Sequence, residues 1–119
     1  MARKKVPKPQ LVFQLFGLEW KTYLVPSDHK DLGKGTDNGA CFYDRREIYL
    51  SEALSDEQLV TTLAHEIQHA IEDHAGIDYE QPVDPDVADR MTDQVALGWL
   101  FILRGCPDLV EVLKREKPL

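Results

Sequence analysis

Two histidines four residues apart, with a glutamate directly after the first, are the residues of this chain best suited to chemistry. They are His65, Glu66 and His69, in the segment His-Glu-Ile-Gln-His. On an α-helix, residues four apart lie on one face about one turn from each other, so both imidazoles can bind one Zn²⁺. Glu66 is placed to take a proton from a metal-bound water and to deliver it to a leaving amine. The pattern predicts metal-assisted hydrolysis of a peptide bond.

The residues around this motif follow the period of an amphipathic helix. Ser55 and Gln58 form a capping box, and Gly76 ends the pattern. We therefore expect one helix, here called the motif helix, with the histidines and Glu66 facing away from the core. At about 100° per residue, the opposite, apolar arc holds Leu59, Val60, Leu63, Ala64, Ile67, Ala70 and Ile71.

A second helix is predicted from about Pro85 to Arg104. Asp84 followed by Pro85 is typical of a helix start, and Gly105 is typical of a helix end. A stripe of acids on one face of this helix is usually a solvated charged face. Docking beside the motif helix would instead bring the stripe to the histidines, where one carboxylate could bind the metal. The acids recur at i, i+3 and i+7 and are Asp86, Asp89 and Asp93.

The segments before the motif helix are rich in β-forming residues. Residues 11–16 and 19–25 predict a hairpin or two consecutive strands, with a helix from near Phe13 as the alternative. Residues 40–43 and 47–50 predict a second hairpin, whose second strand we place at the sheet edge nearest the motif helix. The segment between the two hairpins predicts a loop with a short helical turn.

Length and composition support one domain with one core, since the chain has 119 residues and 43% hydrophobic content. We expect a flexible basic tail over residues 1–9 and a single domain over residues 10–119. The expected fold class is α+β. An antiparallel sheet of three or four strands would pack on the motif helix, with a second long helix and a short terminal helix over residues 108–115.

Charge and cysteine content argue against several classes of protein. A net charge of −7 argues against a surface that neutralises phosphates, so we expect no direct binding of nucleic acid. The most apolar run, residues 95–103, is about half the ~20 residues of a membrane span, so no membrane partner is expected. Cys41 and Cys106 belong to no Cys-x-x-Cys pair, which favours reduced thiols in a cytoplasmic protein.

The motif helix resembles the zinc-binding helix of the zincin metallopeptidases. In the gluzincin branch of that family, an acid on a following helix is the third zinc ligand, in the pattern Glu-x-x-x-Asp. The segment Asp89-Arg90-Met91-Thr92-Asp93 resembles this pattern, with Asp in place of Glu, and begins twenty positions after His69. The small size of the chain and the segment Cys-Pro-Asp-Leu after the second helix resemble, more loosely, compact phage-encoded metallopeptidases and the ImmA/IrrE group that cleaves repressors.

The resemblance implies a zinc ion held by His65, His69 and Asp89, with Glu66 as general base and acid. Asp93 would orient a ligand histidine or replace Asp89, and Asp86 is a further candidate for the third ligand.

Three more features are expected to lie near such a site. Residues 47–50 would either run along the cleft and pair with an extended substrate, or form an ordinary core strand. Tyr79 would stabilise an oxyanion or be a half-buried loop residue. Glu72 shares the ligand face and would be either a plain surface residue or a group that orients His69, whereas His74 should be a capping or partly buried residue.

The expected function is that of a zinc-dependent metallopeptidase acting on a protein or peptide substrate. Two alternatives remain open. One is a zinc-containing binding or regulatory module without peptidase activity. The other is an acidic interaction protein without any metal.

Overall fold

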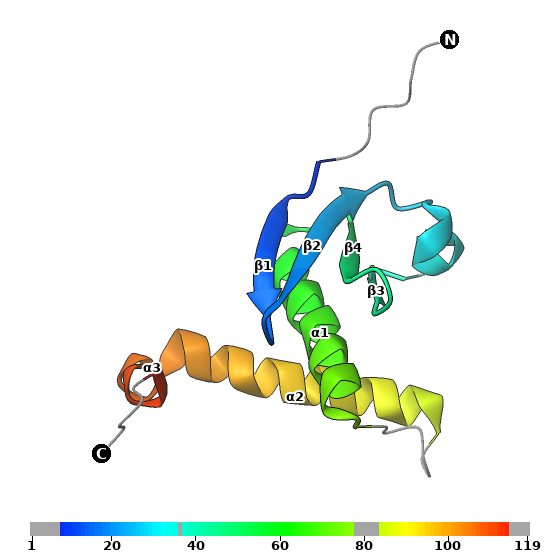
Figure 1. The fold of residues 1–119 in the computed structure, drawn as a ribbon. Helices are drawn as coiled ribbons and strands as arrows, with labels where there is room; N and C mark the ends of the chain where they lie inside the picture. Colours follow the sequence, from blue (N-terminus) through cyan, green and yellow to red (C-terminus); the bar gives the residue numbers. More distant parts are fainter. Residues whose placement is uncertain (1–7, 36, 78–83, 115–119) are drawn as a thin grey trace.

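The structure is a computed structural model that describes residues 8–35, 37–77 and 84–114 (Figure 1). A four-stranded sheet packs on α1, and α2 packs on α1 from another side. The α+β class is confirmed. The elements in chain order are β1 (Leu11–Leu15), β2 (Leu18–Val25), the 3-10 helix η1 (Lys30–Gly35), β3 (Gly39–Phe42), β4 (Glu47–Ser51), α1 (Asp56–Ala75), α2 (Pro85–Gly105) and α3 (Pro107–Lys114).

The sheet is mixed and has the order β1-β2-β4-β3. The two hairpins are antiparallel as expected, but β2 and β4 are parallel, so the prediction of a wholly antiparallel sheet is wrong in this pair. The physical reason is the segment between β2 and β4, which contains η1 and β3 and is long enough to return the chain to the start of β2. The edge strand beside α1 is therefore β3, and β4 is an interior strand, contrary to the expected edge position of residues 47–50.

The first hairpin confirms the strands expected over residues 11–25 and rules out the alternative helix. Its two-residue turn consists of Phe16 and Gly17, whose φ angles are 54° and 76°. Positive φ at both positions is what a type I′ turn needs, and this turn matches the twist of the paired strands. The short helical turn expected before β3 is also present, as η1.

Helix α1 has the boundaries that its capping residues predict. The Ser55 side chain accepts from the Gln58 backbone N–H, and the Gln58 side chain accepts from Ser55 N–H. At the other end, Gly76 adopts the left-handed conformation with φ 71°, and its N–H is bonded to the last turn of the helix. These local contacts start and stop the helix at the predicted positions.

Helix α1 is covered on two sides, and the expected single apolar arc is therefore only part of its buried surface. On the sheet side, Ala70 packs with Trp20, Ile48 and Leu50. On the α2 side, the small residue Ala64 packs with residues of α2. The polar residues of the motif helix therefore do not all face solvent. Gln68 and Glu72 are buried against α2, and Glu66 is buried next to Gly39 of β3.

Two expectations about exposure on α1 are wrong. Val60, in the predicted apolar arc, is 39% exposed, whereas the neighbouring Leu59 packs on the core. His74 is exposed, so of its two expected roles the partly buried one is wrong. Its ring stacks flat on Phe16 in the β1–β2 turn, with the ring centroids 3.9 Å apart.

Helix α2 begins at Pro85, and the Asp84 side chain caps it by accepting from the Asp86 N–H. Within the described ranges, no helix combines the length and the apolar character that crossing a membrane requires. Both cysteines are free thiols. Residues 1–7 of the predicted basic tail, and Tyr79, lie outside the described residues.

Candidate metal centre

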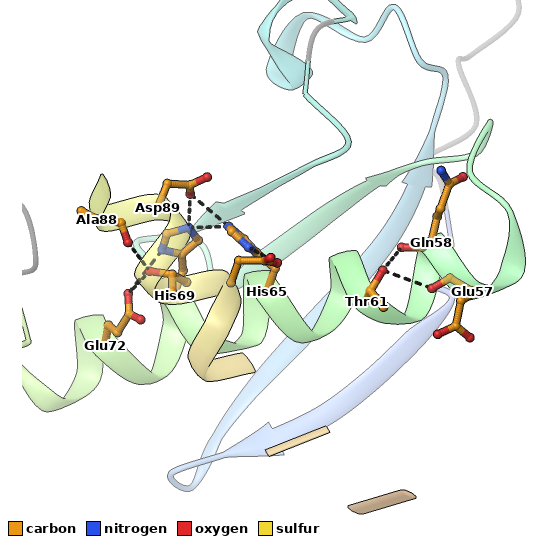
Figure 2. A network of polar contacts seen from close by, with 10 residues as sticks. Glu57, Gln58, Thr61, His65, His69, Glu72, Ala88 and Asp89 are labelled. Atoms are coloured by element: carbon orange, nitrogen blue, oxygen red, sulfur yellow. Dashed lines mark hydrogen bonds and ion pairs between the residues drawn. The ribbon is translucent and has the colours of Figure 1, made fainter. Parts of the chain in front are cut away.

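Helices α1 and α2 bring three of the predicted ligands together (Figure 2). The Nε2 atoms of His65 and His69 are 3.1 Å apart. The Asp89 Oδ1 atom lies 3.0 Å from His65 Nε2 and 3.2 Å from His69 Nε2. One atom from each residue thus points to a common centre, and the carboxylate comes from the neighbouring helix.

These separations match the size of a zinc ion. Zinc in proteins lies about 2.0–2.1 Å from each nitrogen or oxygen ligand, which sets tetrahedral ligand atoms roughly 3.3 Å apart. The observed separations of 3.0, 3.1 and 3.2 Å need to open by only a few tenths of an ångström. Three protein ligands would leave one position of a bound zinc for water, as in catalytic zinc sites. The Asp89 side chain is 63% exposed, so the group of three is open to solvent on that side.

The remaining two acids of the stripe differ in their relation to this centre. The Asp93 Oδ1 atom is 3.1 Å from His65 Nδ1, on the far side of the ring from Asp89. An Nδ1–H bonded to Asp93 would leave Nε2 free for a metal, so Asp93 is placed to orient the ligand. Burial lowers the pKa of His65, but the hydrogen bond to Asp93 and the nearby carboxylates outweigh it and raise the pKa. Asp86 lies in the first turn of α2, outside the group of three.

The other histidine, His69, is backed by a buried polar network, of which Figure 2 labels Glu72. The Glu72 Oε1 atom lies 3.5 Å from His69 Nδ1. This carboxylate accepts from Thr92 Oγ1 at 2.9 Å and from Gln68 Nε2 at 3.1 Å. The Trp99 indole N–H in turn donates to Gln68 Oε1 at 3.0 Å. Glu72 is therefore buried beside His69, so the alternative of a plain surface glutamate is wrong and the alternative of a group that orients His69 remains.

The sequence did not predict that three residues belong to this network, namely Gln68, Thr92 and Trp99. The i, i+4 spacing of Gln68 and Glu72 on one helix is the only local signal that links any of them. Thr92 and Trp99 are joined to the network only by the docking of α2 on α1.

The proposed acid–base residue, Glu66, is buried, with 5% of its surface exposed. Among the described residues, its Oε2 atom has no hydrogen-bond partner. Burial raises the pKa of Glu66 to about 7. The charge of His65 opposes this shift, and the carboxylates of Asp89 and Asp37 add to it. A carboxyl group with a pKa near neutrality can both accept and release a proton at neutral pH, as an acid–base catalyst must.

A hollow lies on each side of the three ligands. One, of about 530 Å³, is lined by Glu66, Gly39 and Asp37 together with His65. The other, of about 440 Å³, is lined by His69 and by Tyr43 at the end of β3. Asp89 lines both hollows, so they adjoin at this residue, and we call the two hollows together the groove.

Strand β3 forms one wall of this groove and is the last strand of the sheet. Ser51 N–H donates to Asn38 C=O at 2.8 Å, so these two residues form a hydrogen-bonded pair. Such pairs alternate along antiparallel strands, and the register therefore makes Ala40 and Phe42 the residues of β3 that are hydrogen-bonded to β4. The backbone N–H and C=O groups of Gly39 and Cys41 consequently face the edge of the sheet, away from β4. An extended peptide could pair with these groups.

Gly39 sets how closely β3 packs on α1. A Cβ atom at this position would lie 2.8 Å from Thr62 Cγ2 and 3.2 Å from Glu66 Cγ. We expect Gly39→Ala to lower the free energy of unfolding by about 1–3 kcal/mol, the usual cost of overpacking. Urea denaturation measures the change, and adding Thr62→Ala should recover most of the loss because it removes the nearest atom.

Gly98→Ala is the matched control for this substitution. A Cβ at Gly98, in the middle of α2, would meet no atom within 4 Å. Alanine there should stabilise the protein by roughly 0.5–1 kcal/mol, since glycine is unfavourable inside a helix. Equal stability of Gly39→Ala and the wild type would contradict the close packing of β3 on α1.

Comparisons of the chain with protein-family models, with curated proteins and with solved structures found no match. What this protein does is therefore inferred from the residues of the groove and from the chemistry that they allow.

Proposed function

We propose that this protein is a zinc-dependent metallopeptidase that hydrolyses a peptide bond of a protein or peptide substrate. The observation that carries the proposal is the group of His65, His69 and Asp89, whose ligand atoms all lie within 4.8 Å of one another. Bound there, zinc would polarise the carbonyl of the substrate and lower the pKa of a water molecule toward about 7. This donor set is the one that the resemblance to gluzincins implies.

Glu66 would perform the proton transfers of the reaction. Its carboxylate would accept a proton from the attacking water and later give it to the nitrogen of the leaving amine. The free Oε2 atom and the pKa of about 7 support this role. Asp93 and Glu72 would hold the rings of His65 and His69 in the orientation that leaves both Nε2 atoms directed to the metal.

The substrate would bind along β3 as an extended chain. Its backbone would pair with the free groups of Gly39 and Cys41, and side chains on either side of the scissile bond would enter the two hollows. Cys41 would not act as a nucleophile, because burial, with the charges of Glu66 and Asp73, raises the pKa of its thiol. The two free thiols also favour a reducing compartment, so we place the protein in the cytoplasm.

Metal content and metal-dependent hydrolysis test this function. Purified protein should contain about one zinc per chain by elemental analysis. A chelator should remove the zinc and abolish peptide hydrolysis, and added zinc should restore both. Zinc at about 100 times its dissociation constant should also raise the free energy of unfolding by roughly 2.7 kcal/mol, because the ion binds the folded chain.

His74→Ala is the matched control, since His74 lies on the same helix but stacks on Phe16 away from the groove. This variant should retain the full zinc content. If the wild type bound no zinc when zinc was in large excess over the chain, the assignment would be refuted. If His74→Ala lost its zinc, the metal would lie elsewhere in the protein.

A further inference from the structure

The end of α2 and all of α3 form an arm that projects to one side of α1 (Figure 1), and the ion pair of Arg104 with Glu57 joins its base to α1. We call residues 101–114 the C-terminal arm. In the part of the chain that the structure describes, α3 contacts α2 and no other helix or strand. Helix α3 has eight residues, and none of them is buried. A helix this short is unstable in water without packing, so α3 needs a surface that covers it.

The C-terminal arm exposes large apolar side chains on several sides. Successive residues of a helix point about 100° apart, so three consecutive apolar residues on α2 cover most of its circumference. A helix that is apolar all round is normally buried. The exposed fractions are 73% for Phe101, 38% for Ile102, 54% for Leu103, 44% for Leu109 and 68% for Leu113.

We propose that the C-terminal arm is a dimerisation surface, and that a second copy of this chain covers it so that two arms pack as a four-helix unit. The proposal goes beyond the peptidase function and does not depend on zinc. Asp89 and Asp93 lie in the first half of α2, so arms that pack through residues 101–114 leave the groove accessible.

The area of exposed apolar surface agrees with a homodimer. At about 200 Å² for each large apolar side chain, the exposed fractions of the five residues correspond to on the order of 500 Å². A standard interface buries about 800 Å² per partner, of which roughly 65% is apolar in homodimers. The C-terminal arm alone therefore exposes about the apolar area that each partner of such a dimer contributes.

The charge of the C-terminal arm also favours a second copy as its partner. The whole chain carries a net charge of −7, so two copies repel each other over most of their surfaces. The arm contains two cations, Arg104 and Lys114, and two anions, Asp108 and Glu111, and is neutral. Two arms can therefore approach each other without repulsion between like net charges.

Sedimentation equilibrium of the full chain tests the proposal. The wild type should have about twice the 13.6 kDa of one chain. Phe101→Glu and Leu113→Glu should each raise the dissociation constant of the dimer at least about 30-fold, as expected for apolar residues at the centre of an interface. Val12→Glu is the matched control, because Val12 is 48% exposed on β1, outside the arm, and this variant should remain dimeric.

Circular dichroism of the glutamate variants shows whether they fold, and this readout does not depend on zinc. Amide hydrogen exchange of the wild type provides a test without substitutions. Exchange over residues 101–113 should slow as the protein concentration rises about a hundredfold, whereas exchange in β1 should not change. A monomeric wild type, a dimer that survives both arm substitutions, or concentration-independent exchange in the arm would each overturn the proposal.

Discussion

Glu66→Gln should leave the protein folded and zinc-bound but should lower its rate of peptide hydrolysis by about 10²–10⁴-fold, the usual contribution of general acid–base catalysis. The amide has the size of the carboxyl group, yet it cannot accept a proton from water. Glu66 is buried beside the ligands, and among the described residues its Oε2 atom has no partner that would make the carboxylate a purely structural group. Hydrolysis of a fluorogenic peptide library by zinc-loaded protein measures the effect.

Glu52→Gln provides the same chemical change at an exposed glutamate outside the groove, and it should retain full activity. Activity of Glu66→Gln within a fewfold of the wild type would remove Glu66 from the mechanism. A wild type that binds zinc and cleaves no peptide would instead favour a zinc-containing binding module.

Glu66→Gln should also change how the free energy of unfolding depends on pH when zinc is absent. Burial raises the pKa of Glu66 from 4.5 to about 7 in the folded chain. Between these values the unfolded chain loses the proton while the folded chain keeps it, so stability falls as pH rises, by about 3 kcal/mol in total. Glu66→Gln removes the titrating group, so this variant does not lose stability in this way as pH rises. In the presence of a chelator it should therefore gain stability relative to the wild type between pH 5 and pH 8, as measured by urea denaturation.

The helix boundaries could be predicted because their causes are local. The capping box of Ser55 and Gln58 and the left-handed Gly76 act within a few residues of the helix ends. The parallel pairing of β2 with β4 could not be predicted in this way, because strand order depends on where the intervening segment returns the chain. The same uncertainty led to the wrong choice of edge strand.

The site was predictable in its types of residue but not in its surroundings. The helical period identified the two histidines and limited the third ligand to three acids of one stripe. The choice among those acids depends on how far α2 slides along α1, and that is set by packing of Ala64 against Ala96 and Leu100. The helical period also assumes one buried side, so it could not foresee that α2 would bury Gln68 and join it to Trp99.

Asp89→Ala should remove most of the affinity for zinc, as His65→Ala and His69→Ala should, because two remaining ligands cannot hold the ion in a four-coordinate site. Asp89 is the acid whose oxygen lies 3.0 and 3.2 Å from the two Nε2 atoms. Asp93 lies behind His65, so Asp93→Ala should weaken binding by roughly 10–100-fold, as is typical for a group that orients a ligand.

Asp86→Ala is the matched control on the same helix face, since Asp86 lies one turn before Asp89 and outside the group of three ligands. Its affinity for zinc should equal that of the wild type. Competition with a chromophoric chelator measures all of these affinities, and circular dichroism shows that each variant is folded. If Asp93→Ala abolished binding while Asp89→Ala retained it, α2 would be displaced by about one turn, or roughly 6 Å, along α1, and Asp93 would be the ligand.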